Sequence, residues 1–416
     1  MAVTDFLTTL WTITPDRPWG IDIPNYFWFT GSSAAAFIIS SFAHVFGIKK
    51  YKPIAGFSLL LAFVLLAVAP LNLIDDLRQP GRVINFFLYG WENFGTSPMK
   101  WGVLLLLAYP LLILAEACVL YREQMIARMQ QTQSLWQKRL YNALICGRTS
   151  LTDEERAKDH RLGYWLGAAG IPLALSVHGY TGYILGAVHS IPLWHTPLMP
   201  ILFLASAMVS GTGLLLLLLP VVQKYFSPLG RVDKALMADL AKLLGWFIVI
   251  DLVVRFFWLT FAMPFNGAEK YALYTFFAHH SFDVVVIEYI IGLFVPLAIG
   301  FTALRHRLPL AIAAGVISAV GVWLFRWNTV IGGQGMGKSF GGLLQYHVAL
   351  TGQDSVMTIA ANFCAFIVVL CLVMLVFPWE EEMKNHYVKG VNHEHQPQEL
   401  FEDGRWSGHS GRSSRL

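Results

Sequence analysis

The sequence predicts an all-α integral membrane protein with about nine transmembrane helices, its N-terminus outside and its C-terminus inside. Hydrophobic residues make up 56% of the 416 positions and charged residues only 13%. This balance leaves too little polar surface to cover a soluble body, whereas lipid-facing helices require such an apolar surplus. Apolar runs of membrane length and an uneven distribution of Lys and Arg complete the prediction.

Each of the nine apolar runs is about as long as the 20 residues that cross about 30 Å of hydrocarbon. The runs lie at 25–47, 54–74, 99–121, 164–190, 197–223, 237–263, 280–304, 308–327 and 355–378. The net charge of +4 is small and comes from the segments between the runs, so it bears on topology and gives no indication of nucleic-acid binding.

Orientation follows from Lys and Arg alone. With the N-terminus outside, the inner segments hold 22 of these residues and the outer segments hold seven, alternating along the chain. Positive charge concentrates on the cytoplasmic side of membrane proteins, so the pattern favours this orientation. The segment 1–24 is then extracytoplasmic, the inner loop 122–163 is expected to form a short surface helix, and the tail 379–416 is expected to be a disordered cytoplasmic end.

Metal-binding patterns are weak. The four cysteines, at 118, 146, 364 and 371, never form a C-x-x-C pair, so iron–sulfur ligation and c-type haem attachment by this chain are not expected. A b-type haem needs two histidines at one depth. His44 and His178 lie inside runs but at different predicted depths, and hydrogen bonding is the better account of His178.

A glycine-rich stretch from Gly332 to Ser339 satisfies the pattern G-x-x-x-x-G-K-[ST]. A phosphate-binding loop needs a preceding buried strand and a following helix, but here a transmembrane run comes first. We therefore expect an external glycine-rich loop, spanning 331–354, that contacts a pocket or a partner.

Charged residues inside runs are costly and mark candidate functional sites. Asp251 and Arg255 are four residues apart and share a helix face, so they can pair, while Asp283 and Glu288 lie in the seventh run. One interpretation is a structural ion pair between helices. The other is a proton path made of these four residues, with Glu288 as its best single carrier because the sequence gives it no local partner.

Charge also gathers where three runs end towards the outer face. The second run ends with Asp75, Asp76, Arg78 and Arg82; the fourth ends after His178 and Tyr180 and is followed by Trp194; the eighth ends at Arg326. Either these are separate charges reaching for the interface, or they converge on one pocket.

The residues at these ends resemble the polysulfide reductase membrane-subunit family, also called NrfD-like. The resemblance rests on three stretches, which are Asp76–Leu77–x–x–Pro80–x–Arg82 followed by Thr96–Ser97–Pro98–Met99–x–Trp101–Gly102; Tyr180–Thr181–Gly182 with Pro192–Leu193–Trp194–x–x–Pro197 and Pro200; and Arg326–Trp327 leading into Ile331–Gly332–Gly333–Gln334. With the first run they cover roughly 25–345. The ninth run and the long inner loop depart from the smallest family members.

The resemblance implies two four-helix bundles, 25–190 and 191–330, followed by one extra C-terminal helix at 355–378. It also implies that the first bundle holds a quinone site near the outer face. Carried over by position, Asp76 and Arg82 form the charged rim and Tyr180 bonds a ring carbonyl. Asn25 and Tyr26 face the ring from the first run, and His178, Trp194 and Arg326 complete the predicted quinone-binding set.

Members of this family anchor extracytoplasmic iron–sulfur subunits, often with a molybdopterin or multihaem subunit, in the bacterial cytoplasmic membrane. The resemblance therefore implies a subunit of a respiratory oxidoreductase that exchanges electrons with menaquinone or ubiquinone, with no haem or iron–sulfur cluster of its own. The loops 75–98 and 332–342 would form the docking surface. The alternative is a secondary transporter that uses Asp251, Arg255 and Glu288 as its ion path.

Overall fold

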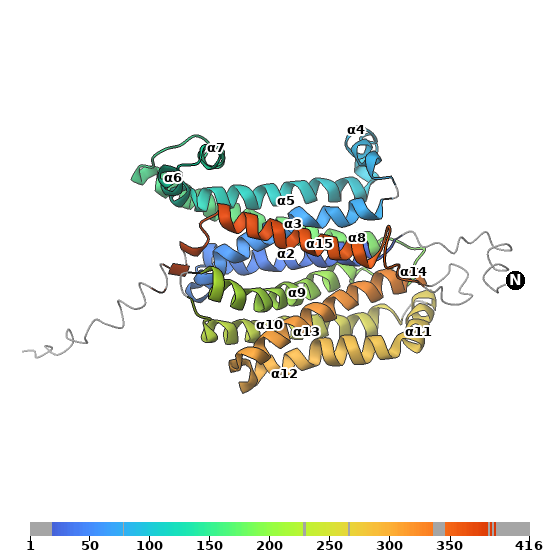
Figure 1. The fold of residues 1–416 in the computed structure, drawn as a ribbon. Coiled ribbons are helices and arrows are strands. Elements are labelled where there is room, and N and C mark those ends of the chain that lie inside the picture. Colours follow the sequence, from blue (N-terminus) through green and yellow to red (C-terminus); the bar gives the residue numbers. More distant parts are fainter. Residues whose placement is uncertain are drawn as a thin grey trace, which may run out of the picture.

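The computed structural model describes residues 19–77, 79–227, 230–264, 267–335, 346–381, 383–384 and 387. Within these ranges the regular structure is helical, and the long helices run in one common direction (Figure 1). Seven of the described helical segments are long and apolar enough to cross a membrane. The chain is therefore a multi-pass membrane protein, as its composition predicts, while the count of nine and the orientation stay predictions.

Most long helices follow the predicted runs closely, although the fourth begins before its run and the seventh run, 280–304, is divided among several helical segments. They are α2 (Asp22–His44), α3 (Lys52–Asp76), α5 (Pro98–Leu120), α8 (Asp153–Gly186), α9 (Met199–Val221), α10 (Lys234–Phe257), α11 (Gly267–Ser281), α12 (Val295–Phe301), α13 (Leu308–Trp327) and α15 (Val356–Val376). Several begin with proline in the first turn, where the missing N–H costs nothing and the fixed φ suits the helix. These prolines therefore mark in the sequence where several of the helices begin.

Shorter elements connect or extend the long helices. They are η1 (Lys49–Tyr51), η2 (Pro80–Ile84), α4 (Asn85–Leu88), η3 (Phe94–Thr96), α6 (Arg122–Gln131), α7 (Leu135–Leu144), η4 (Val222–Phe226), η5 (Trp258–Ala262), η6 (Phe282–Phe294), η7 (Ala303–His306), η8 (Asn328–Gly332) and α14 (Gly333–Gly335). Of these, η4, η5, η6 and η8 are π-helical, with wider turns than an α-helix.

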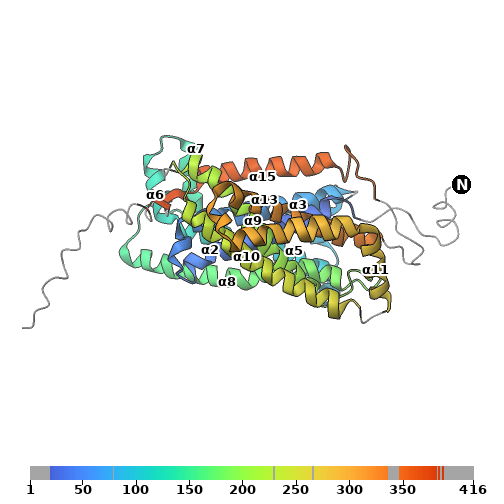
Figure 2. The ribbon, with the colours of Figure 1, turned by 90° about the horizontal axis from the view of Figure 1, so that it is seen from below.

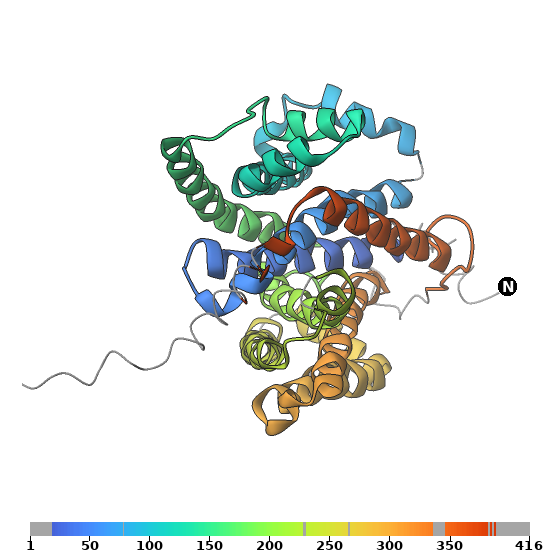
Figure 3. The ribbon, with the colours of Figure 1, turned by 60° about the vertical axis from the view of Figure 1, so that its left-hand side comes forward.

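Helix α2 lies at the centre of the molecule. It packs against α3 and α8 on one side and α9 on the other, and nearly every residue along it is buried. Figures 1 and 3 show α5 and α8 beyond α3 on one side, and α10, α12 and α13 beyond α9 on the other. Helix α15 lies on α3 at the edge of the group and stays largely exposed (Figure 2).

The described residues of the C-terminal tail correct the prediction of disorder from 379 onward. Trp379 and Met383 are buried, and the Trp379 ring packs edge-on against Phe57 of α3 at 6.0 Å between centroids. Tyr387 donates a hydrogen bond to Asp233 at the start of α10. The segment after α15 thus joins α3 to α10, and the predicted disorder of 388–416 falls outside the described residues.

The inner loop 122–163 also holds more structure than the single surface helix predicted. It forms α6 and α7, and α8 begins at Asp153, well before the predicted start at 164. A capping box starts α8, because the Thr152 hydroxyl accepts from the Glu155 N–H and the Glu155 carboxylate accepts from the Thr152 N–H. Arg122 of α6 and Asp159 of α8 form an ion pair that joins the two helices.

The predicted glycine-rich loop 331–354 begins later than expected. Residues through Gly335 continue the helical path of α13, and Gly333, Gln334 and Gly335 are buried. The element before the phosphate-loop-like motif is therefore a helix, which is the wrong context for a phosphate-binding loop. The rest of that motif, 336–339, lies outside the described residues.

Candidate functional site

Trp19 and Gly20, just before α2, contact three segments that are far apart in the sequence. The indole of Trp19 stacks on Trp194, with ring centroids 5.3 Å apart and planes 18° apart. The Trp19 N–H donates to Gln334 Oε1 at 3.1 Å, and Gln334 Nε2 donates to the Trp19 carbonyl at 3.3 Å. The Gly20 N–H donates to Asp76 Oδ1 at 3.2 Å. All three stretches that carry the family resemblance thus reach the Trp19–Gly20 junction or its neighbours.

Trp194 is the buried centre of this junction. Only 2% of its surface is exposed, and its Nε1 donates to the Thr329 carbonyl of η8 at 2.5 Å. A Cβ at Gly333 would overlap the indole, so a side chain at that position would displace the ring. Because Trp194 lies against the helix backbone at this point, position 333 has room only for glycine.

Tyr180 of α8 packs directly on Gly102, the last residue of the Ser97–Gly102 motif at the start of α5. A Cβ at Gly102 would overlap the phenol ring and hydroxyl. Tyr26 of α2 is buried, and α2 packs against α8, which carries Tyr180. Two of the predicted quinone-binding residues, Tyr26 and Tyr180, therefore lie on neighbouring helices.

His178 and Arg326 converge on one backbone carbonyl inside the molecule. Both side chains are fully buried. The Phe203 carbonyl lies 2.8 Å from His178 Nε2 and 2.9 Å from Arg326 Nη2, which also donates to Ser206 Oγ at 2.8 Å. The guanidinium carbon stands 3.8 Å from the centroid of the Phe203 ring. These two predicted residues therefore bind α9. Nε and Nη1 of Arg326 have no hydrogen-bond partner among the described residues.

Asn25 belongs to a network of buried amides between α2, α3 and α15. Its Nδ2 donates to Asn72 Oδ1 at 2.7 Å, and Asn362 Nδ2 donates to the same oxygen at 3.0 Å. Asn362 Nδ2 also donates to Asp75 Oδ2 at 2.8 Å. Trp323 Nε1 lies 3.3 Å from Asn25 Oδ1. Asn25 thus links α2 to Asn72 of α3 and to Trp323 of α13 by hydrogen bonds.

Arg82 does not meet Asp76. It lies in the exposed turn η2, and no hydrogen bond or ion pair joins it to Asp76 in the part of the chain that the structure describes. The two residues lie apart because η2 and α4 lead the chain away from α3 before α5 begins (Figure 1), and the charged rim stays a prediction. Asp76 keeps its place at the Trp19–Gly20 junction.

Asp251, Arg255 and Glu288 form a buried charge cluster. Arg255 Nε donates to Asp251 Oδ2 at 2.7 Å, and Arg255 Nη1 donates to Glu288 Oε1. Asn328 Nδ2 donates to Glu288 Oε2 at 2.7 Å. Glu288 therefore has partners, and both lie far from it in the sequence. Asp283 is not part of the cluster, because it is exposed and its carboxylate lies 3.6 Å from His280.

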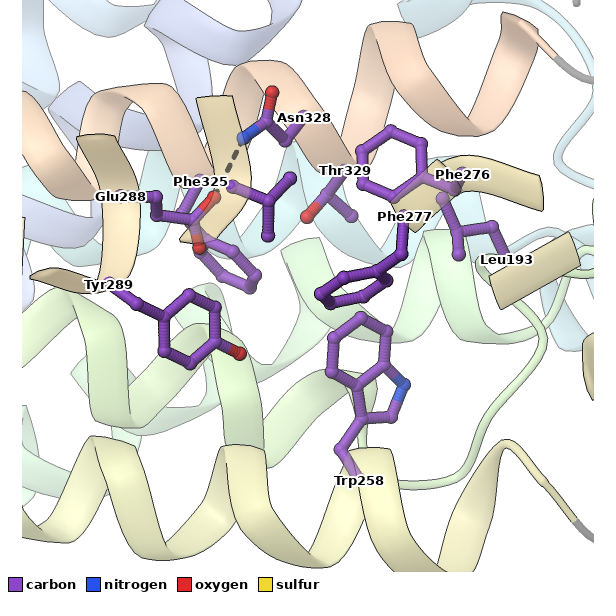
Figure 4. A pocket seen from close by; sticks show the side chains of 10 residues that line it. Leu193, Trp258, Phe276, Phe277, Glu288, Tyr289, Phe325, Asn328 and Thr329 are labelled. Atoms are coloured by element: carbon purple, nitrogen blue, oxygen red, sulfur yellow. Dashed lines mark hydrogen bonds between the residues drawn. The ribbon is translucent and has the colours of Figure 1, made fainter. Parts of the chain in front are cut away.

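A small pocket of about 20 Å³, room for roughly one water molecule, adjoins this cluster (Figure 4). Glu288 and Tyr289 of η6, Trp258 of η5, and Asn328 and Thr329 of η8 line it, so each of these three π-helical segments borders the pocket. The Tyr289 hydroxyl and Trp258 Nε1 are buried and have no hydrogen-bond partner among the described residues. Two orphaned polar groups beside a carboxylate indicate that water or a polar ligand belongs here.

The two histidines inside the predicted runs cannot share one haem. The His178 ring lies against Gly31 of α2, whereas His44 ends that helix. At 1.5 Å per residue the separation along α2 is about 20 Å. Within the described ranges, no three His, Cys, Asp or Glu side chains come together in a way that could hold a metal ion.

Sequence reasoning missed several residues that build these sites. Asn72, Asn362 and Gln334 are uncharged, whereas the predictions for the apolar runs rested on charged residues and histidines. A buried amide also costs free energy unless it is hydrogen-bonded, so an asparagine inside an apolar run is itself a usable signal. Trp19 gave no such signal, because tryptophans near helix ends are usually explained by the membrane interface.

The comparisons with known proteins agree with this arrangement. The family model described as "Polysulphide reductase, NrfD" matches residues 12–336. A selenate reductase subunit of Mesobacillus selenatarsenatis is 35% identical over 248 residues, 58% of this chain and 56% of that protein. A putative dimethyl sulfoxide reductase membrane subunit of Halobacterium salinarum is 28% identical over 56% of this chain and 50% of that protein.

A third relative is an Hdr-like menaquinol oxidoreductase integral membrane subunit of Archaeoglobus fulgidus. It is 27% identical over 56% of this chain and 51% of that protein. The matched part of the chain spans about half the length of these relatives. Because the family model covers more than half of the chain, and because the three stretches quoted above meet in space, the chain belongs to the polysulphide reductase NrfD family.

Proposed function

We propose that this chain is the quinone- or quinol-binding membrane anchor of a respiratory oxidoreductase complex. In this role it exchanges electrons between the membrane quinone pool and an iron–sulfur partner at the outer face. The relatives support the proposal, because they are named as subunits of reductases and one as a subunit of a menaquinol oxidoreductase. The bacterial cytoplasmic membrane is the proposed location.

The proposed topology has nine spans, with α2 and α8 added to the seven apolar segments. Helix α2 has 23 residues and α8 has 34, both long enough to cross. Both carry polar residues on buried faces, which lowers their mean hydropathy without exposing polar atoms to lipid. The N-terminus is then outside, two bundles of four helices follow, and α15 brings the chain back to the inner side.

The single observation that carries the proposal is the convergence around Trp19 and Gly20. Asp76, Trp194 and Gln334 all reach this junction, which the proposed topology places at the outer face. Tyr180 lies against the start of α5, and Tyr26 lies on α2, which packs against the helix of Tyr180. The donor chemistry fits a quinone, because its two carbonyl oxygens accept hydrogen bonds and its ring favours aromatic surroundings.

Within this site we assign roles by position. Tyr180 and Tyr26 offer phenol donors to a ring carbonyl, and the half-buried Asp76 carboxylate is the candidate proton acceptor. A bound quinol supplies two electrons and two protons. His178 and Arg326 fix α8 and α13 on α9, and Trp194 fixes the loop before α9, so these three act as positioning residues.

Electrons then need an acceptor outside this chain. We propose that an iron–sulfur protein docks on the outer face, and that the complex also includes a molybdopterin or multihaem protein. The loop 75–98 and the described end of the glycine-rich segment lie on either side of the Trp19–Gly20 junction and supply the surface. Both come from elements that contact the proposed quinone site.

A second candidate function uses the charge cluster of the second half. Asp251, Arg255 and Glu288 lie beside a pocket with two orphaned polar groups, an arrangement suited to a proton path or to ion-coupled transport. As part of the leading proposal the cluster moves protons during quinol turnover. As the alternative, a secondary transporter, it moves an ion with a substrate and needs no quinone.

Quinone binding separates these two functions. The complex, purified with its copurifying partners, is extracted for quinone and titrated with a quinone analogue. Tyr180→Phe is expected to weaken binding about tenfold, the loss of one hydrogen bond, while the exposed Tyr183→Phe on the same helix leaves it unchanged. A complex without quinone that shows substrate counterflow in vesicles supports the transporter instead.

A further inference from the structure

Helix α7 leaves most of its apolar face uncovered. Its one buried residue is Tyr141, whose hydroxyl donates to the Val376 carbonyl at the end of α15 at 3.2 Å. Trp136 is 79% exposed and Leu140 is 43% exposed. Large apolar side chains with this exposure in one short helix need a covering partner.

The apolar face is continuous with the side that packs on the protein. At 100° per residue, Trp136 and Leu140 lie next to Leu144 and Tyr141, which contact the molecule. Lys138 and Asn142 occupy the opposite side with Leu135, and Arg139 borders the apolar face, where its guanidinium carbon lies 5.9 Å from the centroid of the Trp136 ring. One part of this apolar face therefore packs on the protein, and the adjoining part is left uncovered.

The position of α7 identifies what lies beside it. Figure 1 shows α6 and α7 just beyond the inner end of α5, lying across the direction of the long helices. Helix α5 turns Leu104, Leu107 and Leu111 outwards, so it faces lipid on its free side. A helix that lies across the end of a lipid-facing helix is at the depth of the lipid headgroups.

The charges on α7 complement an anionic surface. Ion pairs with carboxylates occupy Arg122, Arg128, Arg148 and Arg156 of the same inner segment. Lys138 and Arg139 enter no ion pair in the part of the chain that the structure describes, and both are exposed. Neighbouring uncompensated cations above an apolar face containing tryptophan are typical of helices that bind anionic leaflets.

We propose that α7 is an interfacial helix that inserts Trp136 and Leu140 into the inner leaflet and binds anionic phospholipid headgroups through Lys138 and Arg139. The hydrogen bond from Tyr141 to Val376 then connects this membrane-bound helix to the end of α15. The proposal is independent of quinone binding, and it rests on the proposed topology, in which the long helices cross the membrane and this segment lies inside.

Depth is measured on the full chain in a background where the four cysteines are replaced. Trp136→Cys, Leu140→Cys and, as the polar-face control, Asn142→Cys are labelled with a fluorophore in vesicles of phosphatidylglycerol and phosphatidylcholine. We expect lipid-borne nitroxides to quench positions 136 and 140, and aqueous iodide to quench position 142. Iodide quenching at 136 and 140 would overturn the proposal and indicate a soluble partner for this face.

Headgroup preference is measured with spin-labelled phosphatidylglycerol and phosphatidylcholine. Lys138→Gln with Arg139→Gln is expected to reduce the preference for the anionic lipid about fivefold or more. Lys158→Gln with Arg161→Gln removes the same charge from the exposed start of α8 and is the matched control. An equal fall in both double variants, or no fall in the first, would overturn the assignment of Lys138 and Arg139.

Discussion

The indole rings of Trp19 and Trp194 stack 5.3 Å apart, although 175 positions separate the two residues. Trp194 also donates to the Thr329 carbonyl, and the backbone beside Trp19 holds Gln334 and, through Gly20, Asp76. The stacked pair therefore connects the ends of α3, α13 and the loop before α9. We regard it as the feature that assembles the proposed quinone site and the partner surface together.

Removing the Trp194 ring should destabilise the protein strongly. Trp194→Ala removes a buried indole and is expected to lower the free energy of unfolding by about 3–5 kcal/mol, whereas Trp194→Phe keeps a stacked ring and loses about 1 kcal/mol with the Thr329 bond. Thermal unfolding in detergent measures both. Trp165→Ala, on the exposed side of α8, is the control, and a shift as large as that of Trp194→Ala would contradict this role.

The contact between Gly102 and Tyr180 predicts that a single methyl group disturbs the site. Gly102→Ala should displace the phenol ring and lower quinol oxidation about as much as Tyr180→Ala, because the new Cβ occupies the position of the ring. Gly95→Ala, where nothing lies within 4 Å, controls for changes in the same connecting region. Wild-type turnover in Gly102→Ala would show that the position of Tyr180 does not matter.

If the charge cluster carries protons, a substitution in it should slow proton movement and leave electron transfer unchanged. Glu288→Gln keeps an acceptor for Asn328 but removes the charge that faces Arg255. We expect electron transfer to the partner to persist while proton uptake or release in vesicles falls at least tenfold. The exposed Asp239→Asn, at the inner end, is the control. If both processes continue unchanged, the cluster is a structural ion pair and not a path.

The same cluster predicts a stability effect. Arg255→Leu leaves the carboxylates of Asp251 and Glu288 buried without their cation, and should cost about 3–5 kcal/mol of stability. Glu288→Gln should cost less, because Asp251 still pairs with Arg255. Comparing the melting temperatures of the two variants tests this order, and the reverse order would contradict the geometry.

The segment after α15 is predicted to stabilise α3 through the buried ring of Trp379. Trp379→Ala should lower stability by about 3–5 kcal/mol, because the ring is buried against Phe57. Trp246→Ala, on the exposed side of α10, should have little effect. Equal melting temperatures for Trp379→Ala and the wild type would show that the segment after α15 does not hold α3.

Much of the fold follows from the sequence, because a membrane helix has to be both long and apolar. The run 308–327 coincides with α13, and 355–378 differs from α15 by only one or two residues at each end. The starts of α8 and α11 were missed, because both helices begin with polar residues outside the apolar run. Hydropathy detects the part of a helix inside the lipid and not its extension beyond it.

The site is less accessible to sequence reasoning. Asp76, Tyr180 and Trp194 were found through motifs, and the structure places them at or near one end of the molecule. Arg82, which the motif also contains, lies in the exposed turn η2, and its place at the rim of the pocket stays a prediction. Trp19, Asn72 and Asn362 were missed because their partners are distant in sequence, and only the packing of α2 against α3 and α15 brings them together.

Quinol-driven reduction of the iron–sulfur partner in the purified complex tests the central claim most directly. We predict rapid reduction in the wild type and in Asp239→Asn, and at least a tenfold slower rate in Tyr180→Phe and in Asp76→Asn with the complex still assembled. Reduction at the wild-type rate in both site variants, or a wild-type complex that quinol does not reduce, would contradict it.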